Sequence, residues 1–442
     1  MKRRPSILVI FLTVFIDLIG FGIVVPLLPL YTREFGAHGI VIGIIFSVYS
    51  AVQFIFSPIW GKLSDRIGRR PILLMSTAGA CVSYVIFALA SGATNPSLAL
   101  GLIIFSRILA GICGANITVA QAYVADITPA EKRTKMMGIV GMAIGLGFVF
   151  GPGIGALSLS GIGITGPGWI AAALSASNFV LAYFILRESR NPDSEQARPR
   201  PHLDQWIHTL TRPKAGLLVI VFFFATFCFS CFEATLSLLV SDNFHLDLIE
   251  AGKTAGFLIV FVGLIGALIQ GGATGRLVRK LGEPNLIMIS LVLTGIALAL
   301  VPFMKGNLGF SWGLLFRPEG WPWLQLIIAL CVLAIGSSLA RPPIFGLLSN
   351  LTASHEQGAT LGVAQGSGSL ARIFGPLFAT ALYSPKSLPR WLTAPSHSAS
   401  GIFQHPGALP YLVCGGIAVI TGLIAAKQLR GAHAEFGAPA TA

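Results

Sequence analysis

Charged residues are scarce in this chain of 442 residues. They make up 11% of it, whereas 54% of the residues are hydrophobic. A soluble domain carries about 25% charged residues, so this composition excludes an ordinary soluble protein and indicates an integral membrane protein. The net charge of +13 does not indicate a nucleic-acid partner, because most charges fall in short stretches between apolar runs, as membrane topology requires.

Motifs for metal, redox and nucleotide chemistry are missing as well. The six cysteines all lie in apolar runs, and Cys228 and Cys231 have the C-x-x-C spacing. A zinc or redox site would need two more ligands or a thioredoxin-like context, so we expect these cysteines only to pack between helices. The eight histidines lie in predicted loops or tails, and no phosphate-binding loop of the G-x-x-x-x-G-K-[ST] type is present. We therefore expect the protein to have no metal site, no cofactor and no enzymatic activity.

Long apolar runs dominate what is present. A membrane-spanning helix needs about 20 mostly apolar residues, and we predict twelve spans. The first follows a basic N-terminus, but Asp17 interrupts it and further spans follow, so we interpret it as a membrane helix and not as a signal peptide. The predicted spans are Ile7–Leu30, Ile40–Trp60, Ile72–Ala90, Leu98–Val119, Met136–Leu157, Trp169–Leu186, Leu217–Val240, Ala255–Gly275, Leu286–Phe303, Leu324–Leu347, Ala359–Tyr383 and Pro410–Ala426.

Lysine and arginine are distributed unevenly between the predicted loops. Most of the 30 fall in the two termini and in the links that follow the even-numbered spans. Because basic loops stay in the cytoplasm, this bias predicts a multi-pass protein of the cell (inner) membrane with both termini cytoplasmic. The basic residues on the opposite face are Arg33, Lys253, Lys305, Arg317, Lys386 and Arg390.

A polar stretch rich in proline and arginine divides the spans into two groups of six. We interpret residues 188–214 as a cytoplasmic linker between an N-terminal bundle, residues 1–187, and a C-terminal bundle, residues 215–442. Within the linker, Leu203–Leu210 is predicted to form a short amphipathic helix. The halves echo each other, since Phe374-Gly375-Pro376 repeats Phe150-Gly151-Pro152. Such a repeat predicts a two-bundle transporter that holds its substrate between the halves.

The link between the second and third spans carries the strongest motif. It reads G-x-x-x-D-R-x-G-R-R and resembles the loop between helices 2 and 3 of the major facilitator superfamily. In that family these positions form a latch that closes the cytoplasmic side, and Arg69 is expected to pair with Asp126 at the end of the fourth span. The alternative is that the basic residues only fix topology. The motif residues are Gly61, Asp65, Arg66, Gly68, Arg69 and Arg70.

Five charged residues lie inside predicted spans, where a charge is costly. They are Asp17, Arg107, Glu233, Arg341 and Arg372, and we assign no role to the last two. A carboxylate or arginine at mid-membrane costs roughly 2.5–3.5 kcal/mol on insertion scales. Asp17 matches an acidic position in the first helix of the family's drug:proton antiporters, and Arg107 resembles their helix-4 arginine, which is implicated in proton transfer. The alternatives are a packing role for Asp17 and snorkelling to the outer surface for Arg107. Glu233 is either a second proton or substrate site or a residue of the outer vestibule.

The fifth predicted span carries a glycine–proline pattern. Three of its glycines recur every fourth residue, which places them on one helix face and lets another helix approach closely. The pattern resembles the antiporter signature of the superfamily's exporters, although Ala156 stands at its last glycine position. The alternative is generic packing of small residues. The motif residues are Gly138, Gly147, Gly151, Pro152 and Gly155.

The N-terminal half is similar to the bacterial tetracycline and multidrug:proton antiporters. The run Ala122–Thr128 adds to this likeness, whereas Ala255–Gly275 and Leu286–Phe303 lack the ionisable groups that tetracycline exporters carry there. The resemblance implies an all-α major facilitator fold of twelve helices that exports an amphipathic small molecule in exchange for protons, as a monomer in the lipid bilayer. A symporter that imports a sugar or metabolite is the alternative. A membrane enzyme or receptor would need a nucleophile–base pair, a metal cluster or a sensor domain, and the sequence shows none.

Overall fold

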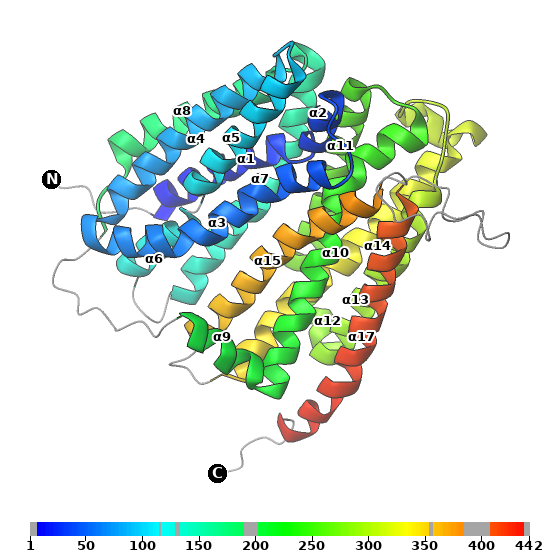
Figure 1. Cartoon of the computed structure of the whole chain (residues 1–442). Coiled ribbons are helices and arrows are strands. Elements are labelled where there is room, and N and C mark those ends of the chain that lie inside the picture. The colour runs from blue at the N-terminus through cyan, green and yellow to red at the C-terminus, as the bar shows by residue number, and fades with distance from the viewer. Residues whose placement is uncertain are drawn as a thin grey trace. The chain divides into compact units, whose positions relative to one another are not determined.

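The computed structural model describes residues 7–114, 116–128, 133–189, 202–352, 357–383 and 407–436 (Figure 1). The regular structure in these residues is entirely helical. Eleven stretches of the described chain are long and apolar enough to cross a membrane. The predicted all-α membrane protein is therefore confirmed.

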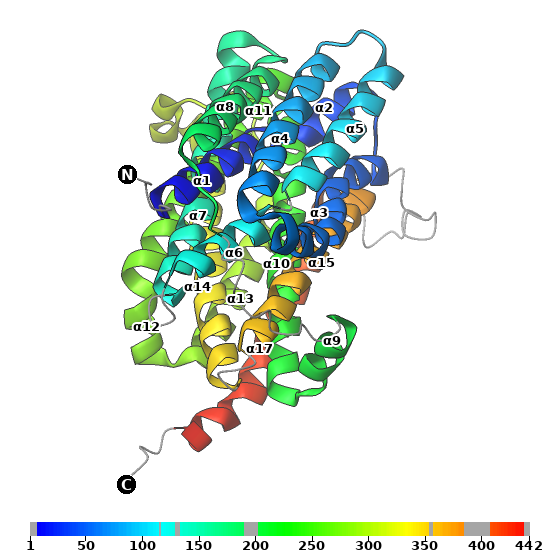
Figure 2. The ribbon, with the colours of Figure 1, turned by 90° about the vertical axis from the view of Figure 1, so that its left-hand side faces the viewer.

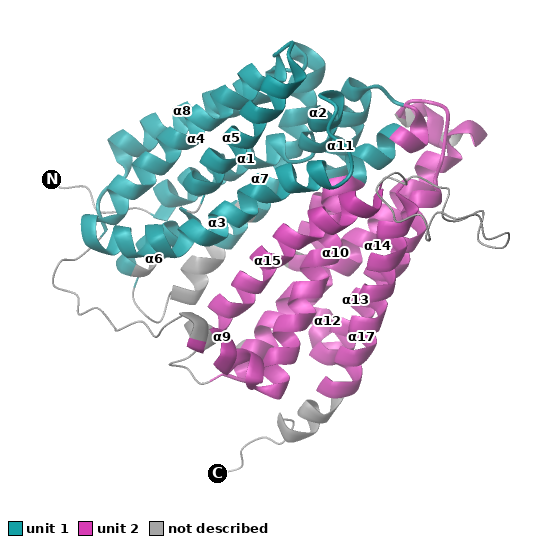
Figure 3. Cartoon of the chain, in the orientation of Figure 1, with its two compact units in different colours: residues 1–196, 236–241, 246–261 teal, residues 197–235, 242–245, 262–442 magenta. Residues whose placement is uncertain are grey.

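The chain forms two compact units (Figure 3). Unit 1 holds residues 1–196, 236–241 and 246–261, and unit 2 holds residues 197–235, 242–245 and 262–442. The boundaries proposed from the sequence, 1–187 and 215–442, stay a prediction. The helices of unit 1 are α1 (Ile7–Val24), α2 (Leu28–Glu34), α3 (Ile40–Ile67), α4 (Arg69–Ser91), α5 (Pro96–Gly114), α6 (Ile117–Ile127), α7 (Arg133–Ile162) and α8 (Gly166–Ile185).

Unit 2 begins with the linker helix α9. It contains most of α10, and α11 starts in unit 1 and ends in unit 2. A π-helical turn at Ile269–Ala273 joins α11 to α12, and three short 3₁₀ turns lie between α13 and α14. The helices are α9 (His202–Thr211), α10 (Pro213–Phe244), α11 (Leu248–Leu268), α12 (Thr274–Leu281), α13 (Glu283–Leu300), α14 (Trp321–Asn350), α15 (Gln357–Tyr383) and α17 (Ala408–Phe436).

Two spans that the sequence predicted as continuous helices are each divided in two. The first breaks between α1 and α2, around Pro26, because proline lacks the N–H that would continue the helix. In the fourth, α5 ends at Gly114 and α6 begins at Ile117, with Asn116 directly before α6. Ala115 lies outside the described residues.

The eleventh predicted span, Ala359–Tyr383, corresponds to helix α15. This helix has 27 residues but is not among the eleven apolar stretches. Its first half is rich in glycine and serine and contains Gln365, which lowers its mean hydropathy. The predicted amphipathic segment of the linker is also helical, as α9, and Trp206 packs against Gly366 of α15, where a Cβ would lie 2.6 Å from the indole ring.

Close helix contacts hold each unit together. In unit 1, α1 packs along α7, and α4 lies alongside α5 and α8 (Figures 1 and 2). In unit 2, α13 packs against α14 and α17. Buried aliphatic and aromatic residues such as Ile23 and Phe87 fill the interior of unit 1. This packing fixes the polar residues of α1, α4 and α5 next to one another.

The internal repeat is visible in the backbone. Gly68 precedes α4 with φ 105°, and Gly282 precedes α13 with φ 76°. Residues with a Cβ rarely adopt positive φ, so glycine is required at both turns. The repeat also extends to packing, since Gly151 of α7 faces α1 and Gly375 of α15 faces α10.

Candidate functional site

Asp17 lies in the interior of unit 1, in the middle of α1. Its side chain is 7% exposed. Asn116, at the start of α6, donates a hydrogen bond from Nδ2 to Asp17 Oδ2 over 3.2 Å. This hydrogen bond joins the start of α6 to the middle of α1. A buried carboxylate is thus held by a neutral donor, an arrangement that lets it bind and release a proton without breaking an ion pair.

Arg107 is buried on α5, with 1% of its surface exposed. Its guanidinium carbon lies 5.1 Å from the ring centre of Phe87 and 5.9 Å from that of Tyr84. Nε donates a long hydrogen bond of 3.4 Å to Ser106 Oγ, and Nη2 has no hydrogen-bond partner among the described residues. Snorkelling to the surface would leave the guanidinium exposed, which is not what the structure shows. Cation–π contacts partly replace the lost hydration.

Tyr84 connects the two charged residues. Its hydroxyl is close enough to both Asp17 and Arg107 for electrostatic interaction. A Cβ at Gly20, one turn after Asp17, would lie 3.0 Å from the Tyr84 ring, so α1 and α4 are in close contact here. The structure therefore brings the sequence-predicted Asp17 and Arg107 into one polar cluster with two residues, Tyr84 and Asn116, that sequence reasoning missed.

The sequence contains a feature that points to Asn116. It is an amide inside an otherwise apolar run, where a polar side chain needs a partner. A neighbouring polar contact lies on α3, where Gln53 Nε2 donates to the Gly114 carbonyl over 2.7 Å and to the Tyr49 hydroxyl over 3.2 Å. Gln53 thus provides a hydrogen-bond donor for the carbonyl of Gly114, the last residue of α5.

The glycines of the antiporter pattern form a seam between α7 and α1. A Cβ at Gly147 would lie 2.5 Å from Leu18 Cβ. A Cβ at Gly151 would lie 2.7 Å from Gly22 Cα, and one at Gly155 would lie 2.7 Å from the Ile23 carbonyl oxygen. The seam therefore touches α1 along the turns that directly follow Asp17.

Pro152, in the same helix, lies between α1 and α11, and a Cβ at Gly22 of α1 would lie 3.3 Å from its ring carbon Cδ. A Cβ at Gly256 would lie 2.7 Å from the Pro152 carbonyl oxygen and 2.8 Å from Ala156 Cβ. Ala156, which replaces a glycine of the family pattern, is therefore accommodated by a glycine on the opposite helix. Gly138 lies near the start of α7.

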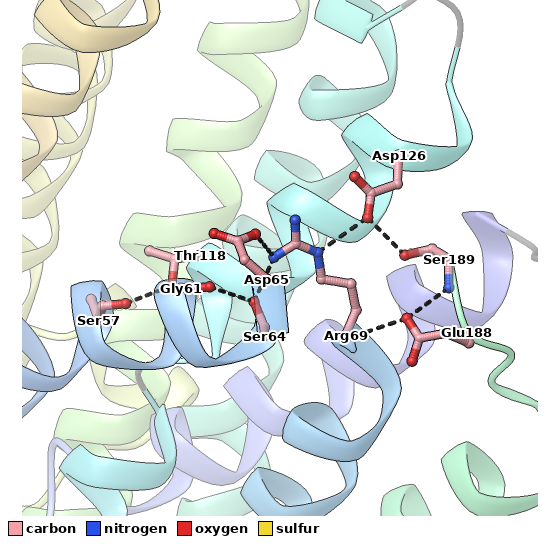
Figure 4. A network of polar contacts seen from close by, with 9 residues as sticks. All are labelled: Ser57, Gly61, Ser64, Asp65, Arg69, Thr118, Asp126, Glu188 and Ser189. Carbon is pink, nitrogen blue, oxygen red and sulfur yellow. Dashed lines mark hydrogen bonds and ion pairs between the residues drawn. The ribbon is translucent and has the colours of Figure 1, made fainter. Parts of the chain in front are cut away.

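The charged link between α3 and α4 forms a polar network (Figure 4). Arg69 Nη1 contacts Asp65 Oδ1 at 2.5 Å, and Arg69 Nε donates to Asp126 Oδ2 over 3.1 Å. Nη1 also donates to Ser64 Oγ over 2.6 Å. Arg69 therefore joins the end of α3 to the end of α6, and we call Asp65, Arg69 and Asp126 the latch cluster.

The remaining link residues have different surroundings. Arg70 turns away from the latch cluster and donates from Nε to the Leu186 carbonyl and from Nη2 to the Tyr183 carbonyl, both over 2.8 Å. Arg66 is exposed at the end of α3. A Cβ at Gly61 would meet nothing within 4 Å, so packing in the described structure does not require glycine there.

Glu188, just after α8, is a residue of this network that sequence reasoning missed. Its Oε1 accepts from the Arg69 N–H over 2.9 Å and its Oε2 from the Arg70 N–H over 3.1 Å. The carboxylate that receives the first amides of α4 is therefore that of Glu188. A Cβ at Gly68 would collide with this carboxylate, which is a second reason for glycine at that turn.

Replacing Glu188 should loosen the start of α4. In Glu188→Ala, the first two amides of the helix lose their acceptor, and loss of such a cap costs about 0.5–2 kcal/mol. We expect hydrogen–deuterium exchange at the Arg69 and Arg70 amides to become several-fold faster. The matched variant Glu319→Ala, at an exposed glutamate in a 3₁₀ turn, should leave that exchange unchanged. Unaltered protection in Glu188→Ala would show that the capping bonds contribute nothing.

Glu233 is in the part of α10 that belongs to unit 2. It is half-buried, and Arg372 of α15 is near enough for electrostatic interaction. The structure therefore does not join Glu233 to Asp17 and Arg107 within one unit. Its immediate charged neighbour is an arginine, which the sequence did not indicate.

The cysteines pack between helices, as Cys228 and Cys231 show. Their thiols donate weak hydrogen bonds to the Cys414 and Gly375 carbonyls over 3.3 and 3.2 Å. Among the described residues, no three histidine, cysteine, aspartate or glutamate side chains come close enough to hold a metal ion.

Comparison with known proteins identifies relatives along most of the chain. The profile of the Major Facilitator Superfamily matches residues 10–376. The class C tetracycline resistance protein of Escherichia coli is 32% identical over 422 residues, which cover 94% of this chain and 96% of that protein. Multidrug resistance protein 2 of Bacillus subtilis is 30% identical over 387 residues, covering 86% and 90%. The crystal structure of the human organic anion transporter MFSD10 (TETRAN) superposes with a TM-score of 0.60 at 23% sequence identity. The superposition covers 95% of this chain and 98% of the MFSD10 chain, and it supports the fold.

Proposed function

Because this chain belongs to the major facilitator superfamily of transporters, we propose that it exports an amphipathic small molecule in exchange for protons by alternating access. Two of its relatives are named as tetracycline and multidrug resistance proteins, so drug-like or tetracycline-like molecules are the proposed substrate class. No nucleotide-binding loop is present in the sequence, and the proton gradient supplies the energy.

One observation carries this proposal: the buried Asp17 belongs to α1, the same helix that the glycine seam of α7 contacts. Asp17 occupies the middle of α1, and Gly147, Gly151 and Gly155 of α7 contact the turns of α1 that follow it. Without bulky side chains between them, a shift of α7 is transmitted directly to α1. Such a shift changes the surroundings of the carboxylate and hence its tendency to hold a proton.

The polar cluster gives each residue a role in this scheme. Asp17 carries the proton, and Asn116 holds the carboxylate in position through its 3.2 Å hydrogen bond. Arg107, buried at 1% exposure, supplies a fixed positive charge that favours proton release. Glu233 is proposed as a second titrating group, in unit 2.

The latch cluster is proposed to stabilise a state closed on the cytoplasmic side. The positive-inside bias supports a cytoplasmic position for the α3–α4 link and for both termini. The protein is proposed to work as a monomer in the cell (inner) membrane. Asp65, Arg69 and Asp126 connect two helix ends through one guanidinium. Breaking this connection should shift the balance between the two access states.

Asp65→Asn should leave the protein folded and inserted but slow its turnover. The Asp65 side chain is 46% exposed and that of Arg69 is 11% exposed, so the pair contributes about 1 kcal/mol at most, and turnover should fall about fivefold. Initial rates of substrate transport provide the measurement. If the link only fixes topology, removing a positive charge in Lys62→Gln should have the larger effect, and normal turnover in Asp65→Asn would contradict the latch.

The decisive experiment uses proteoliposomes with an imposed pH gradient and a trapped pH-sensitive dye. Lipophilic cations, tetracyclines and neutral metabolites are added in turn, and proton flux triggered by each substrate is recorded. Proton flux opposite to substrate movement supports the antiporter. Flux in the same direction would identify a symporter and overturn the proposal, and substrate movement without any proton flux would also overturn it.

A further inference from the structure

Two arginines inside the helices of unit 2 have no part in the mechanism above. Arg341 lies within α14 and Arg372 near the middle of α15. Arginine stays charged in proteins and is costly within a membrane, so it faces a polar or water-filled space or binds an anion. Sequence patterns alone assign no role to either residue. Their surroundings in the structure supply one.

The Arg341 guanidinium lies among three helices. Its carbon is 5.8 Å from the ring centre of Phe222 on α10 and 5.5 Å from that of Phe345 on α14. Nη2 donates a long hydrogen bond of 3.4 Å to Gln365 Oε1 on α15, and the side chain is exposed. A guanidinium has five N–H donors, and this is the one hydrogen bond that the described residues give to Arg341. The other donors are available to a ligand.

Arg372 adds a second positive charge to the same place. It lies within electrostatic range of Arg341, and also of Glu233 on α10. Its Nε donates a long hydrogen bond of 3.4 Å to the Gly368 carbonyl of its own helix. Two like charges repel each other more strongly between helices than in water. When all three are ionised, Arg341, Arg372 and Glu233 together carry one net positive charge, which an anion would neutralise.

We propose that Arg341 and Arg372, with Gln365, bind an anionic oxygen group, such as a carboxylate or sulfonate, on the transported substrate. The planar fork of a guanidinium matches two oxygens of such a group. Phe222 and Phe345 lie beside the Arg341 guanidinium and offer flat apolar surface to the body of the molecule. The substrate is therefore an amphipathic organic anion. This inference rests on the proposed transport function and specifies its substrate class.

Export of an anion also fits the energetics of a cell membrane. An interior-negative potential drives anions outward, with about 2.3 kcal/mol per charge for each 100 mV. Exchange of an exported anion for an entering proton moves positive charge inward and draws on the potential as well as on the pH gradient. Glu233, beside Arg372, then competes with the substrate anion for the same arginine.

The test compares two probes that differ only in charge. Dansylglycine carries a carboxylate, and dansylglycinamide carries a neutral amide on the same aromatic body. Binding of each to the purified full-length protein in neutral detergent is followed by dansyl fluorescence, with no pH gradient present. We expect wild type to bind dansylglycine at least tenfold more tightly than the amide, since charge-assisted bidentate hydrogen bonds are the strong ones.

Substitutions at Arg341 test whether this arginine causes the preference for dansylglycine over dansylglycinamide. Arg341→Gln should weaken dansylglycine binding about tenfold and leave dansylglycinamide binding unchanged. Arg341→Lys keeps the positive charge but not the planar fork, so its affinity for dansylglycine should lie between those of wild type and Arg341→Gln. This variant keeps the test decisive if Arg341→Gln misfolds. Arg279→Gln, at an exposed arginine of α12, is the matched control and should bind both probes as wild type does. Equal binding of both probes by wild type, or equal loss of both in the Arg341 variants, would overturn the inference.

Failure of this inference is distinguishable from failure of the transport mechanism. Selective binding of dansylglycine without proton flux in proteoliposomes would preserve the anion site and reject the antiporter. Proton-coupled movement of lipophilic cations, combined with equal binding of both dansyl probes, would preserve the antiporter and reject the anion site.

Discussion

Asp17→Asn is expected to abolish substrate accumulation driven by a pH gradient and to reduce it to the level of protein-free vesicles. Asparagine has nearly the shape of aspartate, but its amide does not gain or lose a proton near neutral pH. Its oxygen can still accept the hydrogen bond from Asn116 Nδ2, which is 3.2 Å from Asp17 Oδ2. A neutral amide also costs less inside a membrane than a carboxylate, so folding and insertion should be retained.

Movement of substrate down its own concentration gradient should persist in Asp17→Asn. Exchange of labelled for unlabelled substrate needs alternating access but no proton, so it should persist and become independent of pH. The measurement is counterflow in proteoliposomes at several pH values, beside uptake driven by a pH gradient.

Asp242→Asn is the matched control for Asp17→Asn. Asp242 lies near the end of α10 and accepts a hydrogen bond of 2.9 Å from the Tyr383 hydroxyl, so it has no place in the proposed proton cycle. Normal coupling is expected in this control. Accumulation at the wild-type level in Asp17→Asn would show that Asp17 has only a packing role.

Gly151→Ala should destabilise the α1–α7 contact and impair transport. The added Cβ would lie 2.7 Å from Gly22 Cα and 2.8 Å from the Ile19 carbonyl oxygen, which are backbone atoms that cannot rotate away. Overpacking of this kind costs about 1–3 kcal/mol. We expect the apparent Tm in detergent to fall by roughly 5 °C and the transport rate to fall with it.

Gly145→Ala makes the same chemical change in the same helix. A Cβ at Gly145 would meet nothing within 4 Å. Alanine is also the better helix former, by roughly 0.5–1 kcal/mol in soluble proteins, so the Tm should stay equal or rise slightly. Equal Tm values for the Gly145 and Gly151 variants would show that α1 and α7 are not in tight contact at the seam.

The twofold similarity of the halves could be read partly from the sequence and partly only from the structure. The recurrence of glycine at Gly68 and Gly282 is visible in the letters, and the structure explains it by positive φ at both turns. The sequence could not reveal that Gln53 of α3 donates a hydrogen bond to the Gly114 carbonyl at the end of α5, because this bond joins residues of separate helices.

The sequence by itself determined the membrane class, nearly all the spans and the motif positions, because hydropathy, charge bias and residue spacing are local properties of the chain. Only the tertiary structure decided which residues meet. Asn116 reaches Asp17 across 99 residues, and Glu188 reaches Arg69 across 119. Arg341 and Arg372 also became neighbours only through the packing of α14 against α15. Hydrogen bonds and charge contacts between helices depend on how the helices pack, and helix packing is a property of the whole fold.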